Sequence, residues 1–477
     1  MVAHAQARRA RRGDRDSRMS AEPLPTRADV VVIGAGVAGL SAAARLADVG
    51  RRVVVLEAAP RLGGRTTAFE DRETGERVDN GQHVLFGCYR DTYAFLRRIG
   101  SDGLAPLQPR LALTMADDNG RARRLQCPRL PPPWHLVAGL LRWSALSWSD
   151  RVSALRIRPL LDAARRGSAE AAARDVPSDQ TVTGWLDAHR QSAGIRRWLW
   201  HPLAIAALNQ HPDVAAARPF VRVLAELFGP RVEDSSVGLP TVPLDDLYAA
   251  PARRFIEARA GVVATKTPAR LTAADSNERS WRVFARGQSM EAPAVICAVA
   301  WHALARAFGE AVPPALDALV SAASARRSSP IVTVNVWLDG PLFDGPFIGL
   351  VDGPIQWAFD KSAIFGERAG HLSLVASGAD ALAEMDAASI VDRATTELRR
   401  ALPVMTSRRV LRSVVVKERR ATFSLAPGEP PRPATRTPLA GFYLAGDWIE
   451  TGLPGTIESA ARSGHLAAEA VLADAAR

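Results

Sequence analysis

The stretch ADVVVIGAGVAGLSAAARLADVGRRVVVLEA, residues 28–58, decides the fold class. It contains an apolar run at 30–33, a glycine-rich turn GAGVAG at 34–39, a helical pattern that ends at Gly50, and a second apolar run that ends at Glu57. A strand, a turn, a helix and a strand in this order are typical of a βαβ unit. We therefore predict an α/β fold built on a parallel sheet.

The three glycines of the turn each have a separate physical role. Gly34 allows the tight turn, Gly36 lets a pyrophosphate approach the backbone, and Gly39 lets the helix pack closely on the strand. The helix N-terminus offers free N–H groups and a positive dipole end to phosphates. Glu57, 18 residues after Gly39, can accept hydrogen bonds from a ribose diol. The pattern predicts a Rossmann-type domain that binds a dinucleotide.

Two further motifs favour FAD over NAD. RLGGRTTAFE, residues 61–70, holds a second glycine pair that lets the chain fold back over the dinucleotide, with Arg65 able to reach a phosphate. Near the C-terminus, YLAGDW at 443–448 and GLPGTIESAARSG at 452–464 form a strand, a Gly-Asp pair, a turn and a helix. Together these motifs resemble the FAD-dependent amine oxidase and phytoene desaturase superfamily.

The resemblance implies that the last turn closes the FAD site that the first strand opens. Asp447 would bind the ribityl-pyrophosphate region, and the backbone of Gly455, Thr456 and Ile457 would face the isoalloxazine edge. A strand near Arg270 would lie beside the adenine. The cofactor-binding residues implied in this way are Gly34, Gly36, Gly39, Glu57, Gly64, Arg65, Gly81, Gln82, Arg270, Gly446, Asp447, Gly455, Thr456 and Ile457.

The resemblance also implies a domain organisation, in which a GR2-like FAD-binding domain is interleaved with an α+β substrate-binding domain. We expect residues 1–27 to be a disordered Arg-rich tail. The FAD-binding domain would comprise residues 28–100, 230–300 and 425–477, and the substrate-binding domain residues 101–229 and 301–424. The latter stretches are rich in Leu, Ala, Val and Trp, which suits an apolar channel for a long substrate or an ordinary core.

A narrower resemblance rests on VDNGQHVLFGCYRDTYAFLRRIG at 78–100, WLWHPLAIAALNQHPDVAAARPFVRVLAELF at 198–228, and the Gly-Asp-Trp ending. These strings resemble the hydroxysqualene dehydroxylase family of bacterial squalene and hopanoid biosynthesis. The resemblance implies FAD-dependent reduction of a hydroxysqualene-like triterpene to squalene with loss of water. Alternatives are an isoprenoid desaturase, an amine oxidase, or a flavin-stabilised scaffold of a membrane isoprenoid complex.

Four side chains are candidates for the chemistry. His83 would lie next to the flavin and protonate a leaving hydroxyl, or it would only pack there. Asp79 is an acid or a turn cap, and Tyr89 is a further candidate. Trp448 would line the substrate side of the site. The residues alone do not decide which of these groups supplies the proton.

Several other classes of site lack a sequence signature. No HExxH, GxSxG or P-loop motif occurs, which leaves metal hydrolases, esterases and kinases without support. Cys88, Cys127 and Cys297 form no CxxC pair, and His201 and His211 have no metal-ligand spacing, so we expect no metal. Three separate cysteines fit a reducing cytoplasm.

The charge and the tryptophans suggest where the protein acts. The net charge is +11, and basic patches interleaved with aromatic residues, as in nucleic-acid binders, are not evident. The excess of positive charge suits the binding of an anionic cofactor or of an anionic membrane surface. The 131–148 stretch, with Trp134, Trp143 and Trp148, is interrupted by Arg142, so its apolar run does not reach the length of a membrane span. It predicts either contact with the inner face of the cell membrane, alongside squalene-pathway enzymes, or an ordinary packed helix.

Overall fold

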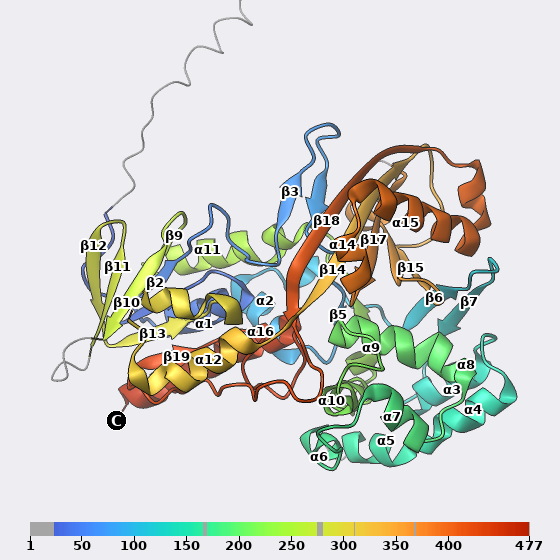
Figure 1. Cartoon of the computed structure of the whole chain (residues 1–477), viewed down its shortest axis with the longest axis horizontal. Coiled ribbons are helices and arrows are strands. Elements are labelled where there is room, and N and C mark those ends of the chain that lie inside the picture. Colours follow the sequence, from blue (N-terminus) through green and yellow to red (C-terminus); the bar gives the residue numbers. More distant parts are fainter. Residues whose placement is uncertain (1–22, 166–168, 274–279, 310, 367–368, 477) are drawn as a thin grey trace, which may run out of the picture.

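The computed structural model describes residues 23–165, 169–273, 280–309, 311–366 and 369–476 (Figure 1). Most of the expected Arg-rich tail, residues 1–27, lies outside the described residues. A parallel sheet with its helices occupies one end of the molecule (Figure 1). A long, mostly antiparallel sheet and a group of helices occupy the other end (Figure 1).

The parallel sheet has five strands in the order β19-β13-β1-β2-β9. Its strands are β1 (Val30–Ile33), β2 (Val53–Leu56), β9 (Val262–Ala264), β13 (Ala294–Cys297) and β19 (Phe442–Leu444). Alternate residues of β1 enter two different cores, Val30 and Val32 on one face, Val31 and Ile33 on the other. The sheet is therefore covered on both faces, which is why its strands read as continuous apolar runs.

One face carries helices α1 (Val37–Asp48), α2 (Arg90–Ile99), α11 (Ala250–Glu257) and α16 (Ile457–Ala475). The other face packs against the antiparallel sheet of β10 (Ala269–Ala273), β11 (Trp281–Ala285) and β12 (Gln288–Ala292) and against α12 (Asp317–Ala325). The short helical turns η6 (Trp301–Ala303), η7 (Ala305–Phe308) and η8 (Pro314–Leu316) lie on this second face too. The ring of Phe308 is 5.3 Å from that of Phe442. Residues 301–309 and 311–325, assigned from the sequence to the substrate-binding part, thus pack beside the parallel sheet.

The two ends of the chain meet through α1 and α16. The Ser41 hydroxyl donates to the carbonyl of Ala461 at 3.0 Å. A Cβ on Gly464 would lie 2.3 Å from the carbonyl oxygen of Ala38, so only glycine permits this approach. The C-terminal helix is consequently fixed against the helix that follows the glycine-rich turn.

The second sheet has seven strands in the order β18-β14-β17-β16-β15-β6-β7. Its strands are β6 (Ala112–Ala116), β7 (Ala122–Gln126), β14 (Ser328–Leu338), β15 (Phe347–Leu350), β16 (Trp357–Asp360), β17 (His371–Ser377) and β18 (Val410–Phe423). On β14, Val334 and its alternate neighbours pack in the same apolar core as α14 (Asp380–Glu384) and α15 (Ala387–Ala401). Because side chains alternate along a strand, Thr333 and Asn335 project from the opposite face. Both are buried.

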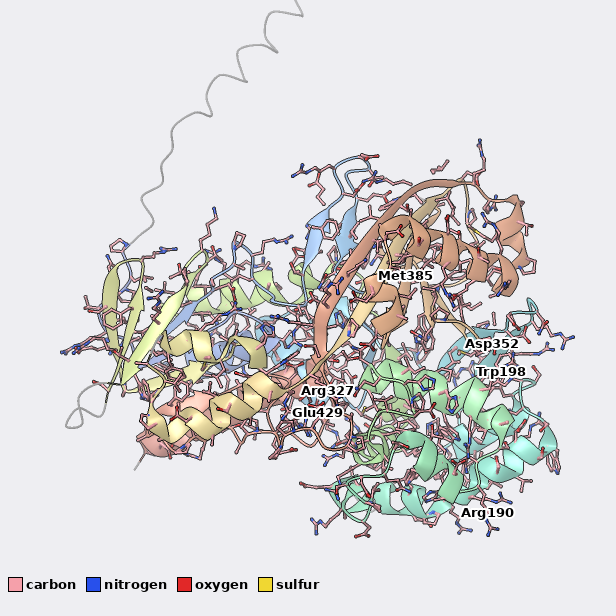
Figure 2. The ribbon with its side chains drawn as sticks, viewed as in Figure 1. Arg190, Trp198, Arg327, Asp352, Met385 and Glu429 are labelled. Carbon is pink, nitrogen blue, oxygen red and sulfur yellow. The ribbon has the colours of Figure 1, made fainter. Side chains whose placement is uncertain are left out.

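The helical region lies at the outer end of this sheet (Figure 1). It comprises α3 (Trp134–Arg142), α4 (Trp148–Ala154), η2 (Leu155–Ile157), α5 (Arg158–Arg165), α6 (Ala169–Arg174), α7 (Val182–Ala188), α8 (Ala193–Ile195), η3 (Arg196–Trp200), α9 (His201–Leu208) and α10 (Ala217–Leu227). Arg197 pairs with Asp352 at 2.5 Å, and Figure 2 shows Trp198 and Asp352 at this junction with the sheet. Throughout the described ranges, no helix is both long enough and apolar enough to cross a membrane.

Short elements join the two sheets. They are β3 (Ala68–Glu70), β4 (Arg77–Asp79), β5 (Leu85–Phe86), β8 (Val237–Gly238), α13 (Lys361–Phe365), η1 (Asp102–Leu104), η4 (Val232–Ser235), η5 (Asp245–Ala249) and η9 (Pro403–Ser407). The chain thus passes repeatedly between a Rossmann-type sheet and an α+β part. The predicted α/β fold with interleaved domains is confirmed.

Candidate functional site

The glycine-rich turn after β1 has the geometry that its three glycines predict. Gly34 has a φ of +100°, and a Cβ there would lie 2.7 Å from the carbonyl oxygen of Ala298. A Cβ on Gly39 would lie 2.0 Å from the carbonyl oxygen of Gly34. The helix therefore packs too closely on the strand for any side chain at position 39. A Cβ on Gly36, in contrast, would meet none of the described atoms within 4 Å. The turn therefore leaves open space in front of α1.

The second glycine pair lies directly over this turn. The Gly63 N–H donates to the carbonyl of Ala35 at 2.8 Å, and a Cβ on Gly64 would be 3.3 Å from the Cα of Gly36. At the end of β2, the Glu57 carboxylate accepts the N–H of Ala35 at 2.7 Å and that of Ala59 at 2.8 Å. Each carboxylate oxygen keeps a further lone pair for a ligand hydroxyl.

The closing Gly-Asp pair reaches the same place from the C-terminus. Gly446 has a φ of +147° and follows β19, which is hydrogen-bonded to β13. The Asp447 carboxylate forms a two-point ion pair with Arg65, with Oδ1–Nη2 at 2.5 Å and Oδ2–Nη1 at 3.0 Å. Arg65 also lies over the ring of Trp301, 5.6 Å from its centroid. The structure thus joins two residues that the sequence separates by 382 positions.

The turn between the C-terminal motif and α16 lies against Phe423 and Tyr89. A Cβ on Gly455 would be 3.1 Å from the Phe423 ring. Thr456 caps α16 by accepting the Ser459 N–H at 3.2 Å, and a hydrogen bond with Thr456 is among the influences on the pKa of Tyr89. Burial dominates and raises that pKa well above its ordinary value, so Tyr89 holds its proton at any working pH.

Turn 79–83 contains a buried cluster that the sequence did not indicate. The Lys361 ammonium lies 3.0 Å from Asp79 Oδ2 and donates to Gln82 Oε1 at 2.7 Å. It also lies 3.8 Å from the centroid of the Phe365 ring. Both charged side chains of the pair are almost fully buried, with exposures of 1% and 2%. Lys361 comes from α13, so the pair ties the seven-stranded sheet to the turn that holds His83.

The electrostatics of this cluster decide the charge of His83. Burial lowers the pKa of His83 to about 4, and the positive charges of Arg65 and Lys361 add to the effect against the attraction of Asp79. His83 is therefore neutral at neutral pH. Its neutral ring is a weak base that takes up a proton only rarely, and once protonated it gives that proton up readily.

Two predicted site residues lie elsewhere. Arg270 is an exposed residue of β10, beside Gly309, whereas the segment next to Glu57 is 264–267, where the Thr267 N–H donates to the Glu57 carbonyl at 2.8 Å. Trp448 is fully buried and donates its indole N–H to the carbonyl of Val299 at 2.9 Å. The Trp448 ring lies in the core beneath the Gly-Asp turn and not along an open surface. Its indole N–H can be buried there because it has the Val299 carbonyl as a partner.

Three features of these residues fit a bound dinucleotide. The first is the open space beyond Gly36. The second is the start of α1, which has no side-chain cap, so its first N–H groups can bind phosphate. The third is the Thr333 hydroxyl, which is buried without a hydrogen-bond partner among the described residues and lies 3.7 Å from a Cβ built on Gly81. Buried hydroxyls normally have a partner, and a ligand beside Gly81 would supply one.

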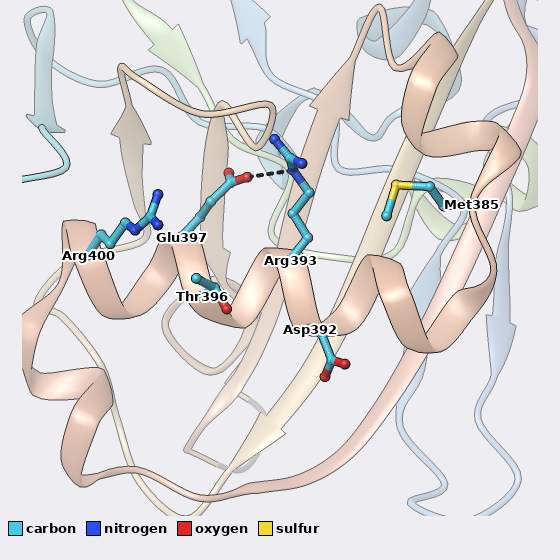
Figure 3. Close-up of a pocket in the computed structure, with 6 residues that line it drawn as sticks. All are labelled: Met385, Asp392, Arg393, Thr396, Glu397 and Arg400. Carbon is cyan, nitrogen blue, oxygen red and sulfur yellow. Dashed lines mark ion pairs between the residues drawn. The ribbon is translucent and has the colours of Figure 1, made fainter.

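A separate hollow lies along α15, far from these residues. It is lined by Met385, Asp392, Arg393, Thr396, Glu397 and Arg400 (Figure 3). Glu397 pairs with Arg393 at 3.4 Å and accepts the Ile355 N–H at 3.1 Å. These contacts join the helix to the loop after β15, and none of the candidate site residues takes part.

Comparison with known proteins gives the family. The sequence profile of the flavin containing amine oxidoreductases matches residues 37–472. The chain belongs to this family. The match shows that the protein is an FAD-dependent oxidoreductase. The predicted cofactor, FAD, and the predicted enzyme class are therefore confirmed.

Two relatives share the narrower resemblance. Hydroxysqualene dehydroxylase from Sinorhizobium fredii is 29% identical over 458 residues, 94% of this chain and 99% of the relative. The enzyme of that name from Rhodopseudomonas palustris is 29% identical over 452 residues, 93% and 98%. A 15-cis-phytoene desaturase from an Oncidium hybrid cultivar is 25% identical over 481 residues, 96% and 80%. The predicted resemblance to the superfamily and to hydroxysqualene dehydroxylases is confirmed.

Solved structures agree with the fold. An oxidoreductase from Methanosarcina mazei has a TM-score of 0.69 and 17% identity, covering 92% of this chain and 99% of that one. Putrescine oxidase bound to putrescine has a TM-score of 0.67 and 18% identity, covering 94% and 99%. At these identities the likeness shows the shared fold.

Proposed function

We propose that the protein reduces hydroxysqualene to squalene with release of water. The observation that carries this proposal is the end-to-end match to hydroxysqualene dehydroxylases, which covers 98% to 99% of the two relatives above. The second candidate is desaturation of an isoprenoid, since phytoene desaturases match at 25% to 26% identity. Those relatives are covered over only 80% of their length.

In the proposed reaction the C–O bond of the allylic alcohol breaks and a C–H bond forms at a carbon of the allylic system. A proton converts the leaving hydroxyl to water, and a hydride equivalent completes the product. Reduced FAD supplies that hydride when it is bound. The protein must therefore hold the alcohol near the cofactor, exclude bulk water and deliver one proton.

The residues that would hold FAD come from both ends of the chain. The α1 N-terminus and Gly36 would bind the pyrophosphate, and Glu57 a ribose diol. Arg65 and Asp447, which pair with each other, would lie at the phosphates and the ribityl chain. The turn at 455–457 would face the flavin ring. The Asp447 and Arg65 pair supports this arrangement because it brings both candidate groups to one point.

The proton would pass through turn 79–83. His83 remains our candidate donor, and its low pKa means that roughly one molecule in a thousand carries the proton at pH 7. Such an imidazolium gives its proton readily to an oxygen beside it. Asp79 and Tyr89 are the alternative acids. Lys361 would act on the turn by fixing Asp79 and Gln82, and through them the position of His83.

The test is product formation by the purified protein. With hydroxysqualene, FAD and dithionite under argon, we expect squalene, and with deuteride-reduced FAD in single turnover we expect one deuterium in the product. His83→Ala should slow product formation while FAD stays bound. An FAD-loaded protein that forms no squalene, or that desaturates phytoene instead, would contradict the proposal. Squalene that forms without label before the flavin N5 hydrogen exchanges with solvent would exclude direct hydride transfer.

We further propose that this reaction takes place at the inner face of the cell membrane. Hydroxysqualene and squalene dissolve in bilayers rather than in water, so an enzyme that exchanges them needs access to lipid. Other enzymes of squalene synthesis would supply the alcohol there. Fractionation of cells that produce the protein checks this, since the protein should sediment with membranes and be released by high salt.

A further inference from the structure

Six large apolar side chains are exposed within residues 130–155. Their exposed fractions are 40% for Leu130, 58% for Trp134, 38% for Leu141, 69% for Trp148, 47% for Val152 and 49% for Leu155. Trp134 and Leu141 are seven residues apart on α3, and the last three are spaced four and three along α4 and η2. Each set lies on one face of its helix. We call these six side chains, with the arginines around them, the α3–α4 surface.

Trp143 does not belong to the α3–α4 surface. It is buried, donates its indole N–H to the Arg123 carbonyl at 3.4 Å and packs edge-on against Trp198 at 6.2 Å. The sequence predicts for this stretch either membrane contact or an ordinary packed helix, and Trp143 is a packed residue. The buried ring anchors the end of α3, while Trp134 and Trp148 project outward.

The same segment carries most of the chain's net charge. Residues 121–158 hold eight arginines and a single acid, Asp150, for a net charge of +7. The Asp150 carboxylate is buried and accepts hydrogen bonds from Ser147 at 2.7 Å and Ser192 at 2.6 Å. Residues 1–20 contribute a further +4, which completes the total of +11, so the rest of the chain is neutral overall. The exposed arginines of the segment are Arg121, Arg124, Arg129, Arg142, Arg156 and Arg158.

We propose that the α3–α4 surface docks the protein on an anionic lipid bilayer. Tryptophan favours the boundary between headgroups and acyl chains, where its ring is apolar and its N–H is hydrated. Arginines around an apolar helix face meet the phosphates of anionic lipids, and the combination holds a helix in the plane of the interface. A second copy of the chain is a poor occupant, because two surfaces of charge +7 would face each other.

Apolar contacts connect this surface to the candidate site. Leu140 of α3 packs on the same core as Leu111, Leu113 and Trp357. These three side chains also pack on the cluster that takes in Val84, next to His83. The proposed route of a lipid-soluble substrate follows these packed side chains from α3 towards turn 79–83. This delivery role rests on the proposed function, whereas the docking itself rests on the exposed side chains and the charge.

The first experiment is flotation of the FAD-loaded full chain with vesicles of phosphatidylglycerol and phosphatidylcholine, against vesicles of phosphatidylcholine alone. Trp134→Ser with Trp148→Ser should lower binding to anionic vesicles at least tenfold. The matched control is Phe284→Ser with Leu411→Ser, two side chains that are 41% and 57% exposed elsewhere. It should change binding less than twofold.

The second experiment replaces exposed arginines. The triple variant Arg124→Gln, Arg129→Gln and Arg142→Gln should bind anionic vesicles as weakly as the variant that lacks the two tryptophans. The same change at the exposed Arg97, Arg254 and Arg399 controls for net charge and should have at most a quarter of that effect. Binding that is equal on neutral vesicles, or unchanged in either α3–α4 variant, would overturn the proposal. Self-association that the tryptophan variant abolishes, without vesicle binding, would assign the surface to a second copy instead.

A third measurement separates docking from catalysis. If the surface delivers substrate, the tryptophan variant should form squalene more slowly from hydroxysqualene in vesicles and at the normal rate from hydroxysqualene in detergent. Vesicle binding is measured without substrate, so a protein that fails as a dehydroxylase would still test the docking. Equal rates in vesicles and detergent would overturn the delivery role.

Discussion

Removal of the buried ammonium in Lys361→Met tests the cluster at turn 79–83. The change leaves the Asp79 carboxylate, only 2% exposed, without its counter-charge. Breaking a buried ion pair by deleting one partner costs about 3–5 kcal/mol, since the remaining charge stays desolvated. Asp79 keeps one hydrogen bond, from the Leu244 N–H at 3.2 Å, which offsets part of the loss. We therefore expect a free energy of unfolding lower by about 3 kcal/mol.

Urea unfolding at pH 7, on FAD-free protein, measures this difference. The double variant Lys361→Met with Asp79→Asn should recover more than half of the loss, because a neutral amide has no uncompensated charge and still accepts the Leu244 N–H. Lys417→Met is the matched control. Its ammonium donates to the carbonyls of Ala383 and Met385 rather than to a carboxylate, so its removal should cost about 1–2 kcal/mol.

The same variant has a second readout at His83. Lys361 is one of the charges that lower the pKa of His83, so its removal should raise that pKa above 4. A titration of the His83 ring by NMR in the full chain reports the shift, with His83→Gln to assign the signal. A loss below 1 kcal/mol in Lys361→Met, an equal loss in the double variant, or an unmoved His83 titration would refute the reasoning.

Other changes have equally definite outcomes. Gly36→Val should fold with an unchanged FAD-free Tm and bind no FAD, and a yellow Gly36→Val protein would refute this. Gly39→Ala should lower the FAD-free Tm, because its Cβ would lie 2.0 Å from a carbonyl oxygen. Hydrogen bonding from Arg412 lowers the pKa of Asp71 to about 2. Asp71→Asn should therefore lower the free energy of unfolding by about 2 kcal/mol above pH 4. In acid titrations of stability, this difference between the variant and the unchanged protein should vanish as the pH falls through 2. A chain that lacks residues 1–18 should keep its FAD absorbance and solubility, and aggregation would contradict this.

The parts of the candidate site that can be predicted from the sequence are those that leave a local pattern of residue types. The turn at 34–39 has one workable geometry, because Gly34 needs a positive φ and Gly39 tolerates no Cβ. Strand β1 is apolar throughout because both of its faces are covered. In each case the residues that satisfy the constraint form a short pattern in the chain, even where the atoms that impose it, such as the Ala298 carbonyl, come from far along the sequence.

The residues that sequence reasoning missed depend on partners far along the chain. Nothing around Lys361 marks it, since its partner Asp79 is 282 residues away and only the packing of two sheets brings them together. Thr333 was missed for the same reason, because a threonine in an apolar strand gives no sign that its hydroxyl lies near Gly81, 252 residues earlier. A buried charge pair forms only when the fold brings its two partners together, so it leaves no pattern in the local sequence.

The tryptophans show why side-chain type alone did not place the surfaces. Trp134, Trp143 and Trp148 lie within fifteen residues of one another, yet Trp143 is buried and the other two are the most exposed large apolar side chains of the described residues. The difference comes from Trp198, which packs on Trp143 from a helix fifty-five residues later. Trp448 behaves in the same way, because the Val299 carbonyl holds its indole under the Gly-Asp turn. A tryptophan whose N–H finds a carbonyl can enter a core without leaving a donor unpaired, whereas an exposed tryptophan at a bilayer interface keeps its N–H hydrated while lipid covers its ring.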